Sequence, residues 1–235
     1  MNKTSRSLFL KLFFVFVFGV AIAYFEAAVV VYLRAIFYPA GFDFPLRMFG
    51  IDSFEKRLLV TEVGREVASL ILIGSAAWLF GRNKCCRLVN FMIIFAVWDI
   101  FYYVWLKVLL DWPTTVMDWD VLFLIPMVWA SPILAPVLIS VLLLIFAGAI
   151  LYFDNQGNPI KAGAIDWIGF FAGAIIVIVS FCIGGRHIYQ PNYADAFRWP
   201  LFGLGCLIGI GFFVKCLILS KISKDKPSPV SKSNL

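Results

Sequence analysis

Charged residues are scarce in this chain of 235 residues. Only 14% of them are Asp, Glu, Lys or Arg, whereas about a quarter are charged in an ordinary soluble domain. Hydrophobic residues make up 62% of the chain, and long uncharged apolar runs recur along its whole length. This composition excludes a soluble domain, a disordered tail and a nucleic-acid-binding protein.

Residues for familiar catalytic chemistry are also few. The chain has a single histidine, His187, and it lacks G-x-S-x-G, P-loop and paired-histidine patterns. Serine hydrolase chemistry, nucleotide binding and haem ligation therefore have no support. The sequence identifies no cofactor and leaves open whether the protein is an enzyme.

Cysteines are few and unpatterned. There are five, none in C-x-x-C spacing, and an odd number argues against a disulfide framework. Three of them fall inside apolar runs, where cysteine behaves as a small hydrophobe. The five positions are Cys85, Cys86, Cys182, Cys206 and Cys216.

The apolar runs have the length of membrane-spanning helices, which need about 20 residues each. With short loops, the chain allows six crossings and leaves no room for a second, soluble domain. We therefore predict one transmembrane domain over 1–235 with an all-α fold, a polytopic integral membrane helical bundle. The expected helices are 8–38, 58–80, 88–110, 133–153, 165–183 and 200–219.

The apolar stretch from Val121 to Phe153 is too long for one straight crossing. It contains Pro126, Pro132 and Pro136, each of which disfavours helix continuation. We predict a short Pro-broken or re-entrant segment over 121–131 before the fourth helix.

The first apolar run resembles a secretory signal peptide, with basic residues before it and the small residues Ala21-Ile22-Ala23 within it. The apolar run continues without a break through Ala27 to Val31, which favours a retained first helix.

Orientation follows from the distribution of Lys and Arg. These residues concentrate near the N-terminus, in the turn at 82–87 and in the tail 220–235, and the opposite loops hold fewer of them and more acids. The positive-inside rule then places both termini in the cytoplasm, in a cytoplasmic (inner) membrane.

Several ionisable residues fall at membrane depth, where each costs at least about 2.5 kcal/mol and is a candidate functional residue. They gather on the outer halves of the first three helices, at Glu26, Arg34, Glu62, Arg65, Glu66, Asp99 and Lys107.

Spacing places these residues on shared helix faces. Asp99, Tyr103, Lys107 and Asp111 are each four apart and form one stripe, as do Glu62 and Glu66 on the second helix. We predict a buried polar network that opens to the outer face and binds a substrate or protons. Its candidate residues are Glu26, Glu62, Arg65, Glu66, Asp99, Tyr102, Tyr103 and Lys107.

Two other interpretations of these charges remain open. The charges could only hold the helices in register, with Glu26 or Glu66 paired to Arg65 and Asp99 paired to Lys107. Alternatively, a metal ion could be bound by carboxylates together with His187. The metal set would be Glu26, Glu62, Glu66, Asp99 and His187; it is weak, because no E-x-x-H or H-x-x-x-H pair occurs.

The second half of the chain is rich in glycine rather than charge. Gly169 and Gly173 form one G-x-x-x-G pair, and Gly205 and Gly209 form another. Small residues at this interval let helices approach closely. They indicate tight packing of the fifth and sixth helices or contact with another subunit, in a homo- or hetero-oligomer.

The leading functional hypothesis is a membrane protein that binds or translocates a small polar solute or protons. The first alternative is a membrane-embedded enzyme that acts on a lipid or quinone-like substrate, with a carboxylate and Tyr102 or Tyr103 in acid–base roles. The second is a non-catalytic subunit or assembly factor of a larger membrane complex.

Overall fold

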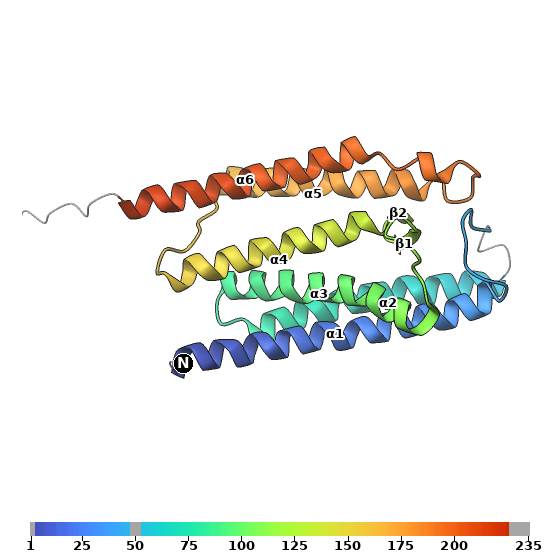
Figure 1. Ribbon diagram of the computed structural model, residues 1–235, viewed down its shortest axis with the longest axis horizontal. Helices are drawn as coiled ribbons and strands as arrows, with labels where there is room; N and C mark the ends of the chain where they lie inside the picture. Colours follow the sequence, from blue (N-terminus) through green and yellow to red (C-terminus); the bar gives the residue numbers. More distant parts are fainter. Residues whose placement is uncertain (1–2, 48–52, 226–235) are drawn as a thin grey trace, which may run out of the picture.

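The computed structural model describes residues 3–47 and 53–225. Long helices dominate this part of the chain, joined by short loops and one hairpin (Figure 1). The helices are α1 (Lys3–Phe37), α2 (Ser53–Phe80), α3 (Lys84–Leu110), α4 (Leu134–Asn155), α5 (Ala164–Gly185) and α6 (Trp199–Asp225), with a short 3-10 helix, η1 (Tyr193–Asp195), before α6.

Each helix overlaps the range expected from its apolar run. The expected first helix began at residue 8, whereas α1 already begins at Lys3, and the stretch Ala21–Ala23 lies inside it without interruption. At the other end α6 continues to Asp225, so the start of the expected tail is helical. The rest of that tail, 226–235, lies outside the described residues.

Within 3–47 and 53–225, six helices are long and apolar enough to cross a membrane, as expected of a multi-pass membrane protein. Large apolar side chains also cover the outside of the bundle: Phe25 is 73% exposed and Leu79 is 82% exposed. Exposed apolar surface on this scale suits contact with lipid rather than water. How many of the six helices cross the membrane stays a prediction.

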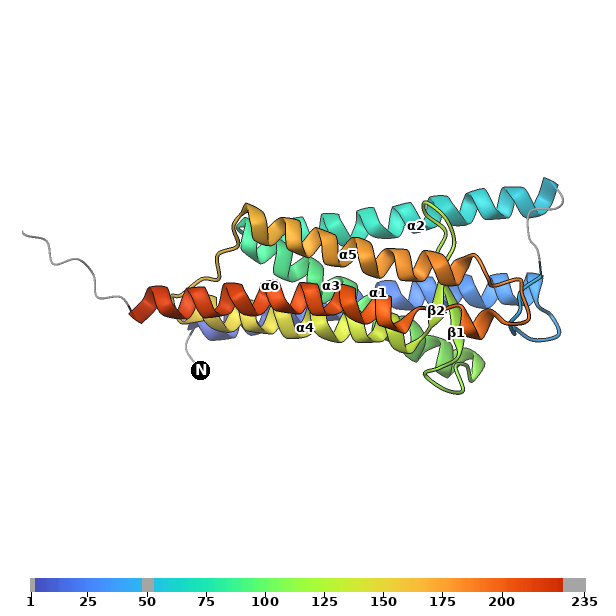
Figure 2. The same cartoon turned by 90° about the horizontal axis from the view of Figure 1, so that it is seen from above.

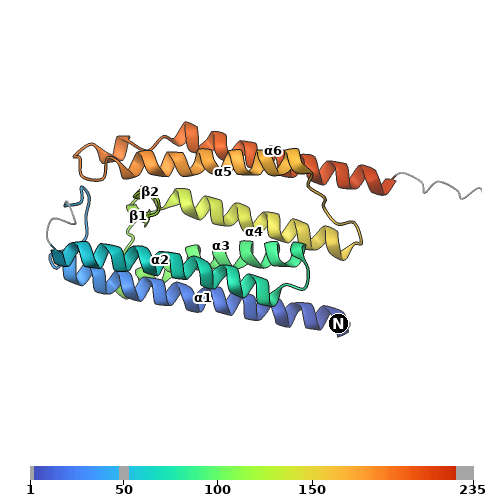
Figure 3. The same ribbon diagram turned by 180° about the vertical axis from the view of Figure 1, so that it is seen from behind.

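The helices form two groups with α4 between them (Figures 1 and 3), and Figure 2 shows the same bundle from above. On one side α3 packs against α1 and α2, and on the other side α5 packs against α6. Helix α4 contacts α3 along the middle of the bundle. The N-terminus and the end of α6 lie at the same end of the molecule, opposite the hairpin. We call the end with the hairpin and the loop 38–47 the hairpin end.

The segment expected to be broken, 121–131, lies in a two-stranded antiparallel sheet. Strand β1 (Trp119–Phe123) pairs with β2 (Trp129–Pro132), and Trp119 lies opposite Pro132. This adds two strands to the expected all-α fold. Proline explains the break, because Pro126 lies between the strands and cannot donate to the ladder. Whether the hairpin enters the membrane stays a prediction.

Helices α5 and α6 approach each other through glycine. A Cβ atom added to Gly173 would lie 2.8 Å from the carbonyl oxygen of Gly205 and 3.2 Å from the nitrogen of Gly209. A Cβ on Gly169 would meet the ring of Phe212 at 2.2 Å. The predicted close packing of these two helices is therefore present, and a contact with another subunit stays a prediction.

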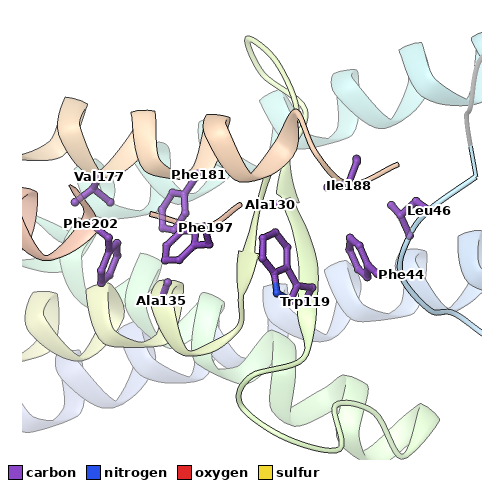
Figure 4. Packing of buried hydrophobic residues seen from close by; sticks show 10 residues of the cluster. All are labelled: Phe44, Leu46, Trp119, Ala130, Ala135, Val177, Phe181, Ile188, Phe197 and Phe202. Atoms are coloured by element: carbon purple, nitrogen blue, oxygen red, sulfur yellow. The ribbon is translucent and has the colours of Figure 1, made fainter. Parts of the chain in front are cut away.

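A hydrophobic cluster at the hairpin end joins segments that are far apart in sequence. Figure 4 shows Trp119 and Ala130 of the hairpin between Phe181 of α5 on one side and Phe44 of the loop 38–47 on the other. The cluster fixes the hairpin between α5 and this loop. The backbone of β1 is thereby held beside the first three helices.

Candidate functional site

A cavity of about 590 Å³ lies inside the bundle towards the hairpin end. Side chains from α1, α2, α3, α5, the start of α4 and the hairpin line it. Seven of the eight predicted site residues are among them: Glu26, Glu62, Arg65, Glu66, Asp99, Tyr102 and Tyr103. These seven residues therefore line one cavity, and their binding of a substrate or protons stays a prediction.

Arg65 is the centre of the first polar cluster in the cavity. It forms ion pairs with Glu26 of α1 and with Glu62 one turn earlier on α2. The Arg65 Nε atom lies 2.9 Å from both oxygens of Glu62, and Ser69 Oγ donates to Glu26 at 3.2 Å. One guanidinium thus serves two carboxylates on two helices, as the register interpretation expected for Glu26.

Glu66 belongs to a different contact, with the hairpin. Its two carboxylate oxygens accept hydrogen bonds from the backbone N–H of Leu124, at 2.9 and 3.1 Å. Within the described part of the chain, Glu66 forms no ion pair, so the expected alternative pairing of Glu66 with Arg65 is absent. This carboxylate joins α2 to the residue that follows β1, and it lines the cavity without an ion pair to any residue that the structure describes.

Asp99 of α3 is bonded to a neutral side chain. Its carboxylate accepts a hydrogen bond of 2.8 Å from Ser140 Oγ of α4, and Ser140 is fully buried. No ion pair of Asp99 is present among the residues that the structure describes. The single hydroxyl donor leaves most of the hydrogen-bonding capacity of this carboxylate unused.

A further polar cluster joins the predicted site residue Tyr102 and the candidate Arg34 to Asp120, which was not predicted as part of the site. Arg34 Nη2 lies 3.4 Å from Asp120 Oδ1, and the Tyr102 hydroxyl donates to Asp120 Oδ2 at 3.2 Å. The Arg34 guanidinium also lies over the rings of Phe42 and Trp112, 3.9 and 3.7 Å from their centroids. Arg34 is 8% exposed and Asp120 3% exposed, so this is a buried pair.

Lys107 is the one predicted site residue outside the cavity lining. The expected pairing of Lys107 with Asp99 is wrong, because the Lys107 ammonium pairs with Asp111 at 2.7 Å, where Asp111 ends α3. Both side chains are exposed, at 50% and 93%. A hydrogen bond from Lys107 and its charge lower the pKa of the Asp111 carboxyl. The predicted stripe along α3 therefore divides, with Asp99 and Tyr103 facing the cavity and Lys107 facing outwards.

The residues considered for a metal site do not come together. His187 lies in the turn after α5, where its Nδ1 is 2.9 Å from the carbonyl oxygen of Ile183, and it does not line the cavity. In 3–47 and 53–225, no group of three or more His, Cys, Asp or Glu side chains is placed to hold a metal ion. The arrangement of Glu62, Glu66, Asp99 and His187 expected for a metal is thus absent there.

The rest of the cavity wall is mainly apolar and aromatic. Phe91, Phe95 and Trp98 of α3 line it beyond Asp99, towards the end of the bundle that carries the termini. The buried indole N–H groups of Trp98 and Trp129 have no hydrogen-bond partner among the described atoms. Along α3 the lining therefore divides into a polar half towards the hairpin end and an aromatic half beyond Asp99, while Phe42 and Phe123 add aromatic surface at the hairpin end itself.

Acids outnumber cations among the described residues that line the cavity. The acids are Glu26, Glu55, Glu62, Glu66, Asp99 and Asp120, and the cations are Arg34 and Arg65. Glu55 pairs with Arg47. Arg34 and Arg65 carry two positive charges against the five other acids, so they neutralise only part of the negative charge. An occupant with a positive charge or with N–H and O–H donors would complement this wall.

Comparison with known proteins gives no family to which this chain can be assigned. No protein-family model, no curated protein and no solved structure matches it. The function is therefore argued from the cavity and its charges.

Proposed function

We propose that this protein is a multi-pass protein of the cytoplasmic membrane that binds or translocates a small cationic solute or protons. The ligand occupies the cavity between the first three helices and the hairpin, and Glu66 and Asp99 accept it. The observation that carries this proposal is the position of these two carboxylates, in one cavity and without counter-ions among the described residues.

The physical reason is the cost of charge at membrane depth. A carboxylate without a counter-ion in an apolar environment is neutralised, either by a proton or by a cation. Glu26 and Glu62 already share Arg65, and Asp120 has Arg34. Glu66 and Asp99 therefore remain for the ligand, and the two arginines set the charge around them.

The side of the membrane follows from the distribution of basic residues. The turn between α2 and α3 and the end of α6 are rich in Lys and Arg, which favours the cytoplasm for that end. The hairpin end then faces outwards, and both termini are cytoplasmic. On this proposal the cavity takes up its ligand on the outer side of the membrane.

A second candidate function is enzymatic. The Tyr102 hydroxyl bonds to Asp120 within the cavity, and such a phenol–carboxylate pair suits acid–base work on a lipid or quinone-like substrate. The third hypothesis, a non-catalytic subunit of a larger complex, has no comparable observation, because Gly169, Gly173 and Gly205 are used within this chain.

The test is flux into liposomes that contain the purified protein. Proton flux is measured with an enclosed pH-sensitive dye, and solute flux with labelled methylammonium. We expect the wild type to exceed empty liposomes for at least one of them, and Asp99→Asn and Glu66→Gln each to lower that flux at least tenfold. The reason is that the amide keeps the shape of the carboxyl group but cannot take up a proton or balance a cation.

Asp166→Asn is the matched control, because Asp166 lies on α5 and pairs with Lys215 outside the cavity lining. It removes a carboxylate from another membrane helix and leaves the flux unchanged. Wild-type liposomes that pass neither probe would contradict the proposal. So would Asp99→Asn and Glu66→Gln proteins that elute as folded protein and keep the wild-type flux.

A further inference from the structure

The cavity is elongated along the bundle. Its lining on α3 extends from Phe91 to Tyr103, which corresponds to about 18 Å at 1.5 Å per residue. The polar groups Asp99, Tyr102 and Tyr103 occupy the half towards the hairpin end, and Phe91 and Phe95 occupy the other half. A small ion needs only the polar half, so the aromatic half is unexplained by the proposed function alone.

Some of the residues that line the cavity are also exposed on the outside of the bundle. Leu59 of α2 lines it and is 41% exposed, and Ala174 of α5 lines it and is exposed as well. Helices α2 and α5 lie on the same side of the molecule, with α3 and α4 behind them in Figure 3. The cavity therefore opens between α2 and α5, on a surface that faces lipid if the six helices cross the membrane.

Less exposed residues near Ala174 and Leu59 line the cavity as well. Ile178, one turn after Ala174, is half-buried and lines the cavity, and so does Leu58 beside Leu59. Ile175 and Val60, at 59% and 72% exposed, do not line it. On α2 and α5 the exposed lining residues are Leu59 and Ala174, and the residue that follows each of them lies outside the lining. Phe91 of α3 also lines the cavity and is 37% exposed.

The charge of the polar half defines which amphiphile fits. Glu66 and Asp99 have no counter-ion among the described residues, so a negatively charged head would meet uncompensated carboxylates. A positively charged head would complement them. The aromatic half would then hold an apolar chain, as mostly apolar ligand sites do.

We infer that the ligand is a cationic amphiphile that enters sideways from the membrane between α2 and α5, with its amine head at Asp99 and Glu66 and its chain along Phe91 and Phe95. This inference rests on the proposed function, because it assigns the ligand of the same two carboxylates. It adds a chain to the ligand and a lateral route of entry.

The experiment measures the thermal unfolding midpoint of the protein in lipid nanodiscs with added dodecylamine, dodecanoate or butylamine. We expect dodecylamine to raise the midpoint and dodecanoate to leave it unchanged, because only the amine complements the carboxylates. Butylamine carries the same head without the chain, and we expect it to need more than tenfold higher concentration for the same shift.

Bulky substitutions test the route. Ala174→Trp narrows the opening from α5, and Leu59→Trp narrows it from α2; each should remove at least half of the dodecylamine shift. The matched controls are Ile175→Trp and Val60→Trp, which place the same indole beside the opening on exposed surface and keep the full shift. The unfolding midpoint of each variant without ligand shows whether it is folded. Ala174 and Leu59 lie on different helices, so the two substitutions test the route independently.

The outcomes separate the inference from the proposed function. If butylamine and dodecylamine act at equal concentrations, the inferred apolar chain of the ligand is wrong. If Ala174→Trp and Leu59→Trp both keep the full dodecylamine shift, the inferred lateral entry is wrong. Neither result contradicts the proposed carboxylate site. If dodecylamine and dodecanoate stabilise the protein equally and Asp99→Asn with Glu66→Gln changes neither, both the amphiphile and the proposed carboxylate site are wrong.

Discussion

Helices α1–α3 and helices α5–α6 are held together by different kinds of contact. The first group is held partly by charge, with Arg65 between Glu26 and Glu62 across α1 and α2. The second is held by close backbone approach, with Gly173 against Gly205. Glycine contacts leave no space and no charge for a ligand, whereas a charged interface surrounds polar volume. The charged residues of the cavity therefore come from the first group and the hairpin, whereas α5 contributes apolar residues to its wall.

The largest effect should come from removing the shared cation. Arg65→Met leaves Glu26 and Glu62 without their counter-ion, and breaking a buried ion pair in this way costs about 3–5 kcal/mol. The measurement is reversible unfolding of the purified protein in mixed micelles.

The triple variant Glu26→Gln, Glu62→Gln, Arg65→Met is the control for that result, because it removes all three charges together. We expect it to recover most of the lost stability. A triple variant as unstable as Arg65→Met would mean that Arg65 acts through packing of its long side chain rather than through charge.

A smaller effect is expected in the glycine-packed half. A Cβ on Gly205 would lie 2.8 Å from the Gly173 carbonyl oxygen, so Gly205→Leu must separate α5 from α6. Overpacking of this kind costs about 1–3 kcal/mol. Gly211→Leu on the same helix is the control, since its Cβ meets nothing within 4 Å. Equal unfolding free energies for the two variants would show that the close approach does not hold the pair together.

The smallest effect concerns Lys107, which the sequence placed in the polar network. Lys107→Ala removes only an exposed ion pair with Asp111, and exposed pairs contribute little. We expect no measurable change in unfolding midpoint or in the flux assay. A loss of flux comparable with that of Asp99→Asn would extend the functional half of the molecule to the outer end of α3.

The helices could be predicted from the sequence because each is a long apolar run bounded by polar, glycine or proline residues. The charges at membrane depth were equally visible, since Glu26, Glu62, Arg65 and Asp99 interrupt such runs on three consecutive helices. Spacing along one helix placed Glu62 and Arg65 on neighbouring faces, and their ion pair is present. These are local properties, and local periodicity is sufficient for them.

The partners from other elements could not be predicted in the same way. Asp120 lies in a segment that looked like a loop, and it becomes buried only because β1 pairs with β2 and carries it inwards. Ser140 is an ordinary small residue of an apolar helix, and the backbone N–H of Leu124 has no side-chain signal at all.

The close contact of α5 with the hairpin has a consequence for the proposed lateral opening. Cβ atoms on Gly184 and Gly185 would lie 2.1 Å from the Ala130 carbonyl oxygen and 1.9 Å from that of Val128, so α5 touches the hairpin backbone directly. Helix α6 in turn packs on α5 through Gly173 and Gly205, so the hairpin, α5 and α6 are in close contact with one another. On the other side of the proposed opening, α2 is bonded to the hairpin, because the Glu66 carboxylate accepts the N–H of Leu124. Any widening of the opening on the α2 side would therefore break the hydrogen bonds between Glu66 and the Leu124 N–H.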